Sequence, residues 1–101
     1  MYQKFIIVSS PGERGGYLRL GSCINHRDLV LGYEKVHGGG WYLRDDEKKS
    51  ITLYGSSCDF GSADFRRLKL IDREFKGYTF IFTPILNLPG NVLDLSDVEW
   101  I

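Results

Sequence analysis

Three segments of the chain carry the apolar or alternating pattern that favours β-strands. Residues 2–9 contain a continuous apolar run, which suits a strand buried on both faces. Residues 17–24 alternate between apolar and polar positions over their first half. Residues 78–83 give the strongest strand signal of the chain, and Pro84 ends it. These segments predict a β-sheet.

A glycine-rich stretch lies between these strands, from Gly38 to Gly61. Residues 33–37 lead as a strand into three consecutive glycines. Residues 41–43 and 50–54 then read as two strands joined by a charged turn. The Gly/Ser loop at 55–61 follows and opens a helix. Such a small-residue loop points backbone N–H groups outward, an arrangement that binds anions.

Two segments carry helical signals. Asn25 is a suitable N-cap for a short helical turn over residues 26–31, and Gly32 ends it. Residues 62–75 predict an amphipathic helix, because apolar residues recur at steps of three and four. Residues 68–70 also alternate, so a strand there remains an alternative.

The element order predicts one α+β domain over residues 1–101, with a mixed sheet of five to six strands and two helices packed on it. Residues 1–83 form the expected core. Residues 84–101 form an acidic C-terminal tail, and we expect Trp100 and Ile101 at its end to pack back onto the body.

The composition narrows the class of protein. A hydrophobic fraction of 43% over 101 residues predicts a single packed core. Thirteen basic and thirteen acidic residues cancel, which disfavours nucleic acid as a partner. No apolar run reaches membrane-spanning length and no secretory pattern is present, so we expect a cytosolic protein that binds no membrane. Cys23 and Cys58 are expected to be reduced, and no spacing predicts a metal or another cofactor.

Two tripeptides imitate protein-kinase motifs. His26-Arg27-Asp28 and Asp59-Phe60-Gly61 spell them, but the metal-binding Asn, the strand lysine and the nucleotide loop of a kinase are missing. A chain of 101 residues is also too short for two kinase lobes. The sequence therefore excludes a kinase.

The glycine triplet and the loop that follows resemble the small phosphohistidine phosphatase family, also called the janus–ocnus family. That family carries a glycine triplet, a hairpin and a Y-G-x-S-x-x-[YF]-G-x-A stretch, and residues 54–63 read YGSSCDFGSA. Lys4 before the first apolar strand matches a family lysine, and His26 lies in the family's H-x-D-[IL] setting. The resemblance covers residues 2–83, with a shorter segment between His26 and Gly38 than in the animal phosphatases.

The resemblance implies metal-independent hydrolysis of a P–N bond, on a phosphorylated protein or a small phosphoramidate. His26 would be the catalytic general base or acid–base group, a role that suits imidazole because its ordinary pKa is about 6.5. Lys4 would bind a phosphate oxygen. The backbone N–H groups of Ser57, Cys58 and Asp59 would hold the remaining phosphate oxygens.

Two substitutions depart from the family pattern. Trp41 follows the glycines where the family usually has Arg, and Asp59 replaces a small residue in the loop. Both make the expected pocket less cationic, which motivates a second hypothesis: a non-catalytic anion- or protein-binding module of the same fold. A third hypothesis is a homo-oligomer with a structural role, in which residues 84–101 pack on a neighbour.

Each candidate residue also has a structural interpretation. His26 could cap a helix start, Lys4 could be a solvated lysine at a strand end, and the loop at 55–61 could be a tight turn that needs small residues. His37, beside the glycines, is interpreted as a structural or rim residue. Cys58 is interpreted as a small loop residue rather than a nucleophile.

Overall fold

The computed structural model describes residues 2–13 and 15–101. This part of the chain contains eight β-strands and three short 3-10 turns, and no α-helix. The elements are β1 (Tyr2–Ser9), β2 (Gly16–Cys23), η1 (His26–Leu29), β3 (Lys35–Asp45), β4 (Ser50–Tyr54), η2 (Phe65–Arg67), β5 (Leu68–Ile71), η3 (Arg73–Phe75), β6 (Thr79–Thr83), β7 (Asn91–Val92) and β8 (Glu99–Trp100). The predicted α+β class with two packed helices is therefore wrong: the protein is nearly all β.

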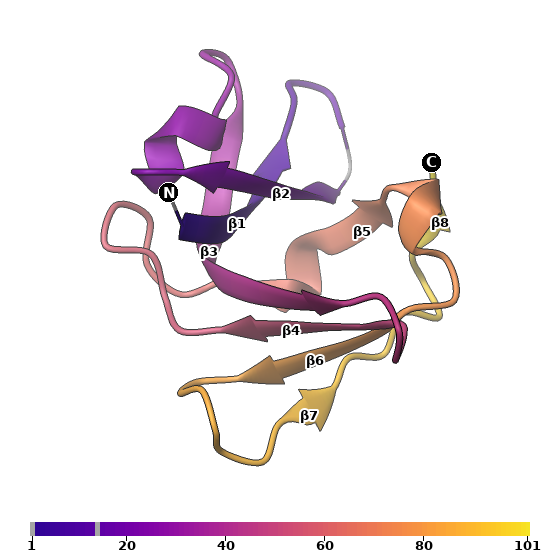
Figure 1. Ribbon diagram of the computed structural model, residues 1–101. Coiled ribbons are helices and arrows are strands. Elements are labelled where there is room, and N and C mark those ends of the chain that lie inside the picture. Colours follow the sequence, from indigo (N-terminus) through magenta and orange to yellow (C-terminus); the bar gives the residue numbers. More distant parts are fainter. Residues whose placement is uncertain (1, 14) are drawn as a thin grey trace.

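All eight strands belong to one sheet, in the order β7-β6-β4-β3-β1-β2-β5-β8. The pairs β1–β2, β1–β3 and β3–β4 are antiparallel, whereas β4 pairs parallel with β6 and β2 pairs parallel with β5. The sheet curves into a half-barrel, with β4, β6 and β7 on one side and β5 and β8 on the other (Figure 1). The sheet is mixed, as predicted, but has more strands than the five to six expected.

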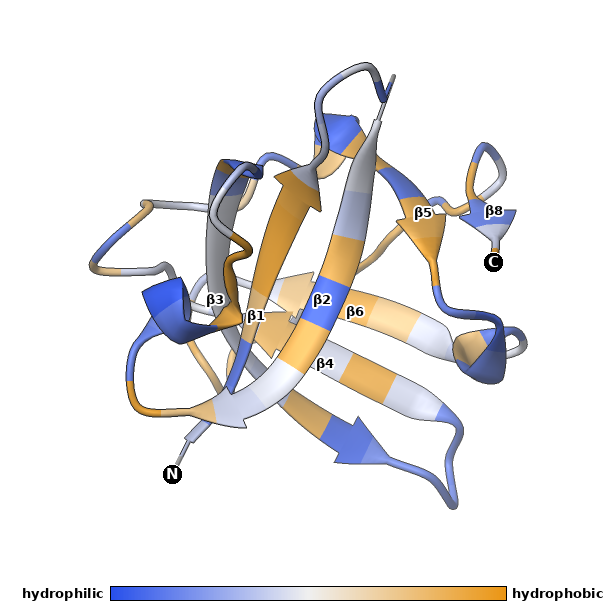
Figure 2. Cartoon of the chain, turned by 90° about the horizontal axis from the view of Figure 1, so that it is seen from above, coloured by the Kyte–Doolittle hydropathy of each residue, from blue (hydrophilic) through white to orange (hydrophobic). Residues whose placement is uncertain are grey.

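The hydrophobic core lies inside this curve, and β1 runs through its middle. Phe5 and Ile7 face the core cluster together with Leu53 and Phe80, all with 0% exposure. Ile6, on the opposite face of β1, is also fully buried, so the continuous apolar run forms a strand buried on both faces as predicted. Figure 2 shows hydrophobic residues along β1 and alternating with polar ones along β2 and β4.

The segment predicted as an amphipathic helix, residues 62–75, instead forms η2, β5 and η3. The physical reason is a pairing partner distant in the sequence: β5 lies parallel to the start of β2, with Gly16 opposite Leu68 and Tyr17 opposite Leu70. Gly16 permits this approach, because a Cβ there would lie 2.9 Å from the Arg67 carbonyl oxygen. The alternative strand at residues 68–70 is the correct interpretation.

The predicted helical turn at residues 26–31 is also shorter than expected. It is a single 3-10 turn, η1, and the Asp28 carboxylate accepts a hydrogen bond of 3.1 Å from the Asn25 N–H. The two strands predicted on either side of the glycines form one continuous strand, β3. A bulge interrupts its pairing with β1, between Ile6 and Val8.

The glycine triplet in β3 lets two other segments approach closely. Gly38 has φ +90°, and a Cβ there would collide with the Ser62 carbonyl group. At Gly40 a Cβ would lie 2.5 Å from the Tyr54 carbonyl oxygen. The triplet therefore brings the loop after β4 directly against β3.

The C-terminal segment packs on both ends of the sheet. β7 pairs with β6, and β8 pairs with β5. Trp100 packs against the core cluster, and the Ile101 carbonyl accepts a hydrogen bond of 2.7 Å from the Arg73 N–H. No helix within the described part of the chain has the length and hydrophobicity needed to cross a membrane.

Candidate functional site

The polar side chains that the structure buries coincide largely with those predicted from the sequence. Among residues 2–13 and 15–101 these are Lys4, His26, Ser57 and Thr83. The first three have exposures of 6%, 3% and 4%. Buried polar groups need internal partners, so the contacts of these three side chains define the site.

Lys4 lies on β1 and places its ammonium group against two aromatic rings. Its Nζ atom is 4.7 Å from the Trp41 ring centroid and 5.7 Å from that of Tyr2. It donates a hydrogen bond to the Ile24 carbonyl oxygen. Ring faces and a carbonyl stabilise a cation without cancelling its charge. The ammonium group is therefore held in place but not neutralised.

His26 opens η1, and its ring is oriented by the glycine triplet. The Gly40 carbonyl can only accept, so His26 Nε2–H donates to it, at 2.6 Å. In the neutral imidazole this leaves the lone pair on Nδ1. Among the residues that the structure describes, Nδ1 has no hydrogen-bond partner. The geometry thus assigns Nδ1 as the nitrogen able to accept a proton.

Trp41 connects the two side chains. Its ring stands edge-on to the His26 ring, with centroids 5.9 Å apart, and also contacts the Lys4 ammonium group. Trp41 lies opposite Lys4 in the pairing of β3 with β1. The structure therefore brings Lys4 and His26 to the same indole ring. Sequence reasoning missed this role because the β1–β3 register cannot be inferred from the residues alone.

The loop at 55–61 is tied to β3 through backbone bonds. The Ser57 N–H lies 3.1 Å from both the Gly39 and the Gly61 carbonyl oxygens, and the Gly39 N–H donates to Gly61 at 3.2 Å. The Ser57 Oγ accepts from the N–H groups of Asp59 and Phe60, each at 3.1 Å. Ser57 is thus the central residue that shapes the loop.

The three backbone N–H groups expected to hold phosphate differ in whether they already donate a hydrogen bond within the protein. The Ser57 and Asp59 amides already have partners inside the protein. Within the described ranges the Cys58 N–H has none, and the Cys58 side chain is exposed. An anion at this loop would find Cys58 N–H available and would compete for the other two.

One ion pair joins η1 to this loop. Arg27 Nη2 lies 3.2 Å from Asp59 Oδ1, with side-chain exposures of 70% and 24%. Arg27 follows His26 directly, so the pair connects the turn that carries His26 to the loop that carries Ser57. In the sequence, Arg27 stands out only as the middle residue of the His26-Arg27-Asp28 motif. No local signal indicates its partner, which lies 32 residues away.

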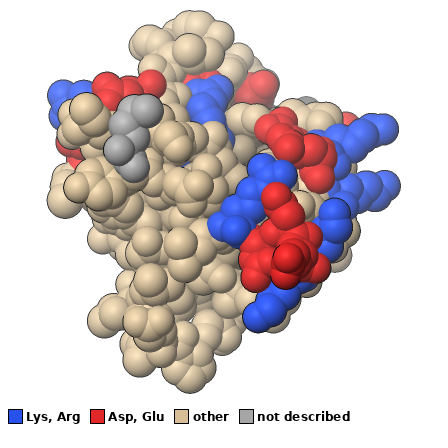
Figure 3. Space-filling model, in the orientation of Figure 1, with Lys and Arg blue, Asp and Glu red and all other residues tan. Residues whose placement is uncertain are grey.

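Other candidate chemistry lies outside this cluster. His37 Nε2 is 2.8 Å from the Ser9 hydroxyl, and burial together with the charges of Arg67 and Lys35 lowers the pKa of its imidazole. Across the described residues, no group of three or more His, Cys, Asp or Glu side chains is arranged to hold a metal ion. Most charged side chains visible in Figure 3 lie on the right of the view with both signs interleaved, and smaller groups lie along its upper part.

Comparison with known proteins gives a family for the chain. The model of the Janus/Ocnus family (Ocnus) matches residues 22–79, more than half of the sequence. The matched part includes His26, Trp41 and the loop with Ser57, while Lys4 lies outside it. No curated protein and no solved structure matches the chain. The match bears out the janus–ocnus part of the resemblance noted in the sequence, and the chain belongs to the Janus/Ocnus family.

Proposed function

We propose that this protein hydrolyses the P–N bond of phosphohistidine or a related phosphoramidate, without a metal, with His26 as the catalytic base. The observation that carries the proposal is the hydrogen bond from His26 Nε2–H to the Gly40 carbonyl. It fixes the ring and leaves Nδ1 to accept a proton, the arrangement that general-base catalysis needs. The family membership supports the same reaction.

In the proposed reaction, water replaces the leaving nitrogen on phosphorus. A water oxygen attacks phosphorus while His26 Nδ1 removes one of its protons. The P–N bond breaks, its electron pair stays on the leaving nitrogen, and that nitrogen takes up a proton from solvent as inorganic phosphate departs, while His26 returns its proton to solvent. Negative charge on the phosphoryl oxygens is stabilised by the Lys4 ammonium group and by the Cys58 N–H.

Lys4 suits this role because, among the described residues, no acidic side chain pairs with it. Its contacts are the Ile24 carbonyl and the Tyr2 and Trp41 rings. A phosphoryl oxygen can replace the carbonyl as acceptor, and the exchange of a neutral acceptor for an anionic one strengthens the hydrogen bond.

The test is release of inorganic phosphate from a phosphohistidine peptide and from phosphoramidate. We expect His26→Gln to lower kcat/KM by at least about a hundredfold, the contribution typical of a positioned acid–base group. Glutamine retains an N–H donor that can reach the Gly40 carbonyl, so the variant removes the base and keeps the buried contact.

His37→Gln is the matched control. His37 is the other histidine of the chain and bonds to Ser9 rather than to the site. We expect it to keep the wild-type rate. Equal activity of the wild type and His26→Gln, or no activity in either, would remove the catalytic proposal.

The second candidate is a non-catalytic anion-binding module. It is favoured by the internal bonds of the Ser57 and Asp59 amides and by the low exposure of Lys4 and His26. This function predicts binding of inorganic phosphate that Lys4→Met weakens, without turnover of either phosphoramidate substrate. The same two assays therefore separate the candidates.

A further inference from the structure

The ion pair between Arg27 and Asp59 places a guanidinium group beside the proposed phosphate site. Arg27 neighbours His26 in η1, and Asp59 lies two residues after Ser57. The pair rests on one N···O contact of 3.2 Å, and the Arg27 side chain is 70% exposed. Neither side chain has a role in the function proposed above.

We propose that Arg27 is a phosphate ligand, which Asp59 binds when the site is empty and releases when a phosphoryl group enters. The inference rests on the proposed function of this site and adds a residue to it. A guanidinium group binds phosphate through two parallel N–H···O bonds, a geometry that its single contact with Asp59 does not use.

The exchange is favoured by the charges and by the exposure of the pair. An exposed ion pair contributes little stability, so its loss opposes binding only weakly. A phosphoryl group carries more negative charge than one carboxylate, and the guanidinium group therefore prefers it. The Asp59 N–H stays bonded to Ser57 Oγ, at 3.1 Å, so the carboxylate can turn away without moving the loop.

This role also accounts for Trp41 at the position where the sequence pattern places Arg. Trp41 holds Lys4 and His26 but brings no charge. Arg27 supplies the second cation from a different element, η1. Asp59, next to the free Cys58 amide, would repel an anion if its charge were unpaired.

A simpler role for Arg27 is to neutralise Asp59 without touching phosphate. The two roles differ once the carboxylate is removed. In an Asp59→Asn background, an arginine that only neutralises Asp59 no longer affects phosphate affinity. An arginine that binds phosphate directly still contributes to it. A double-mutant cycle distinguishes them.

The experiment measures the dissociation constant of inorganic phosphate by calorimetry or NMR titration for the wild type and the variants Arg27→Met, Asp59→Asn and Arg27→Met/Asp59→Asn. We expect Arg27→Met to weaken binding by about tenfold or more, both alone and in the Asp59→Asn background. Asp59→Asn alone should tighten it, because the competing carboxylate is gone.

Arg66→Met is the matched control. Arg66 is also an exposed arginine paired with a nearby aspartate, Asp64, at 3.0 Å. It belongs to η2 rather than η1. We expect it to bind phosphate like the wild type, and thermal unfolding of each variant checks that the fold is retained.

Two results would overturn the inference: equal affinity of Asp59→Asn and the double variant, or no phosphate binding by either the wild type or Asp59→Asn. The proposed hydrolysis is judged separately, by His26→Gln. If hydrolysis depends on His26 but the cycle shows no contribution of Arg27, only the inference fails. If hydrolysis is absent and the cycle holds, Arg27 remains a phosphate ligand of a non-catalytic site.

Discussion

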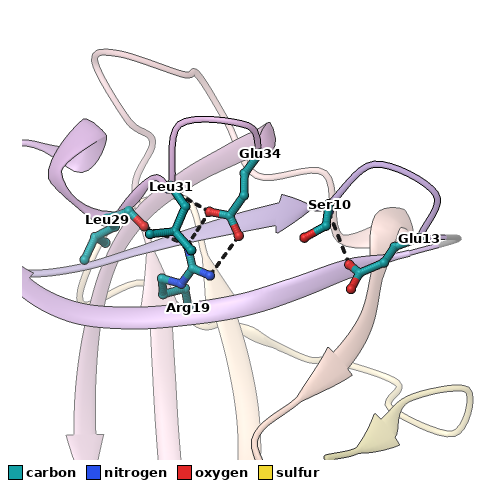
Figure 4. Close-up of polar contacts among 6 residues, drawn as sticks. All are labelled: Ser10, Glu13, Arg19, Leu29, Leu31 and Glu34. Carbon is teal, nitrogen blue, oxygen red and sulfur yellow. Dashed lines mark hydrogen bonds and ion pairs between the residues drawn. The ribbon is translucent and has the colours of Figure 1, made fainter.

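Two cationic side chains on neighbouring strands are held in opposite ways. Arg19 on β2 donates to both carboxylate oxygens of Glu34, at 2.9 Å for Nη2, and also to the Leu29 carbonyl (Figure 4). Lys4 on β1 contacts a carbonyl and two aromatic rings, and within residues 2–13 and 15–101 it contacts no carboxylate. The first cation is neutralised within the protein, and the second keeps its charge.

The difference separates a structural cation from one that can serve a ligand. The Glu34 side chain is only 4% exposed and also accepts from the Leu31 N–H, at 2.8 Å, so the Arg19–Glu34 pair fastens the segment after η1 to β2. A buried carboxylate that loses its partner is costly, which commits both groups to each other. The contacts of Lys4 with a carbonyl and two rings are individually weak, so its ammonium group is not tied to one partner in this way.

The largest effect on stability is therefore expected at Glu34. Glu34→Gln keeps the shape of the side chain but leaves the Arg19 charge without its partner. Breaking a buried pair costs about 3 kcal/mol or more, and we expect about 2 kcal/mol here because Arg19 is 24% exposed. Urea unfolding at pH 7 measures the change, and phosphate affinity should remain that of the wild type.

Glu13→Gln is the control for this prediction. Glu13 accepts from the Ser10 N–H at 3.2 Å in an exposed turn, also drawn in Figure 4. We expect a change of at most about 0.5 kcal/mol in the free energy of unfolding. Equal effects of the two variants would show that the Arg19–Glu34 pair has no special structural role.

At Lys4 we expect the opposite result: a small change in stability and a clear loss of phosphate affinity. Lys4→Met keeps the buried stem and its packing on Trp41 while removing the ammonium group. We expect the free energy of unfolding to change by less than about 1 kcal/mol, because only the contacts of the ammonium group with two rings and one carbonyl are lost. Phosphate affinity should fall by about tenfold.

Calorimetric titration and urea unfolding of the same Lys4→Met sample test both parts. A large loss of stability with unchanged phosphate affinity would make Lys4 a structural cation like Arg19. Lys4 and Arg19 would then have the same structural role.

The fold class predicted from the sequence is wrong, whereas motif order singles out three polar side chains that the structure buries. Lys4, His26 and Ser57 were found from motif order, and burial was then observed for all three. The helix at 62–75 was wrong because its apolar spacing fits a helix as well as a strand, and the β2 edge that decides between them lies some 50 residues earlier. The Arg27–Asp59 pair was missed for the same reason, since both partners look like ordinary exposed charges until the chain folds.

The smallest expected effect is the pH dependence of the Arg19–Glu34 pair. The hydrogen bonds from Arg19 lower the pKa of the Glu34 carboxyl below its ordinary value of 4.5, although burial opposes the shift. A lowered pKa means that the pair contributes stability above the unfolded-state pKa and loses it as the pH falls through the folded-state pKa. The difference in unfolding free energy between the wild type and Glu34→Gln should therefore be constant from pH 7 to about 5 and shrink below about pH 4.

This difference isolates Glu34, because the other carboxylates titrate alike in both proteins and cancel. Urea unfolding at pH 7, 5, 4 and 3 would measure it. Since no carboxylate in the part of the chain that the structure describes pairs with Lys4, the difference between the wild type and Lys4→Met should not vary over the same range. A pH-dependent difference for Lys4→Met would reveal an acidic partner for Lys4, and its charge would then not be free for phosphate.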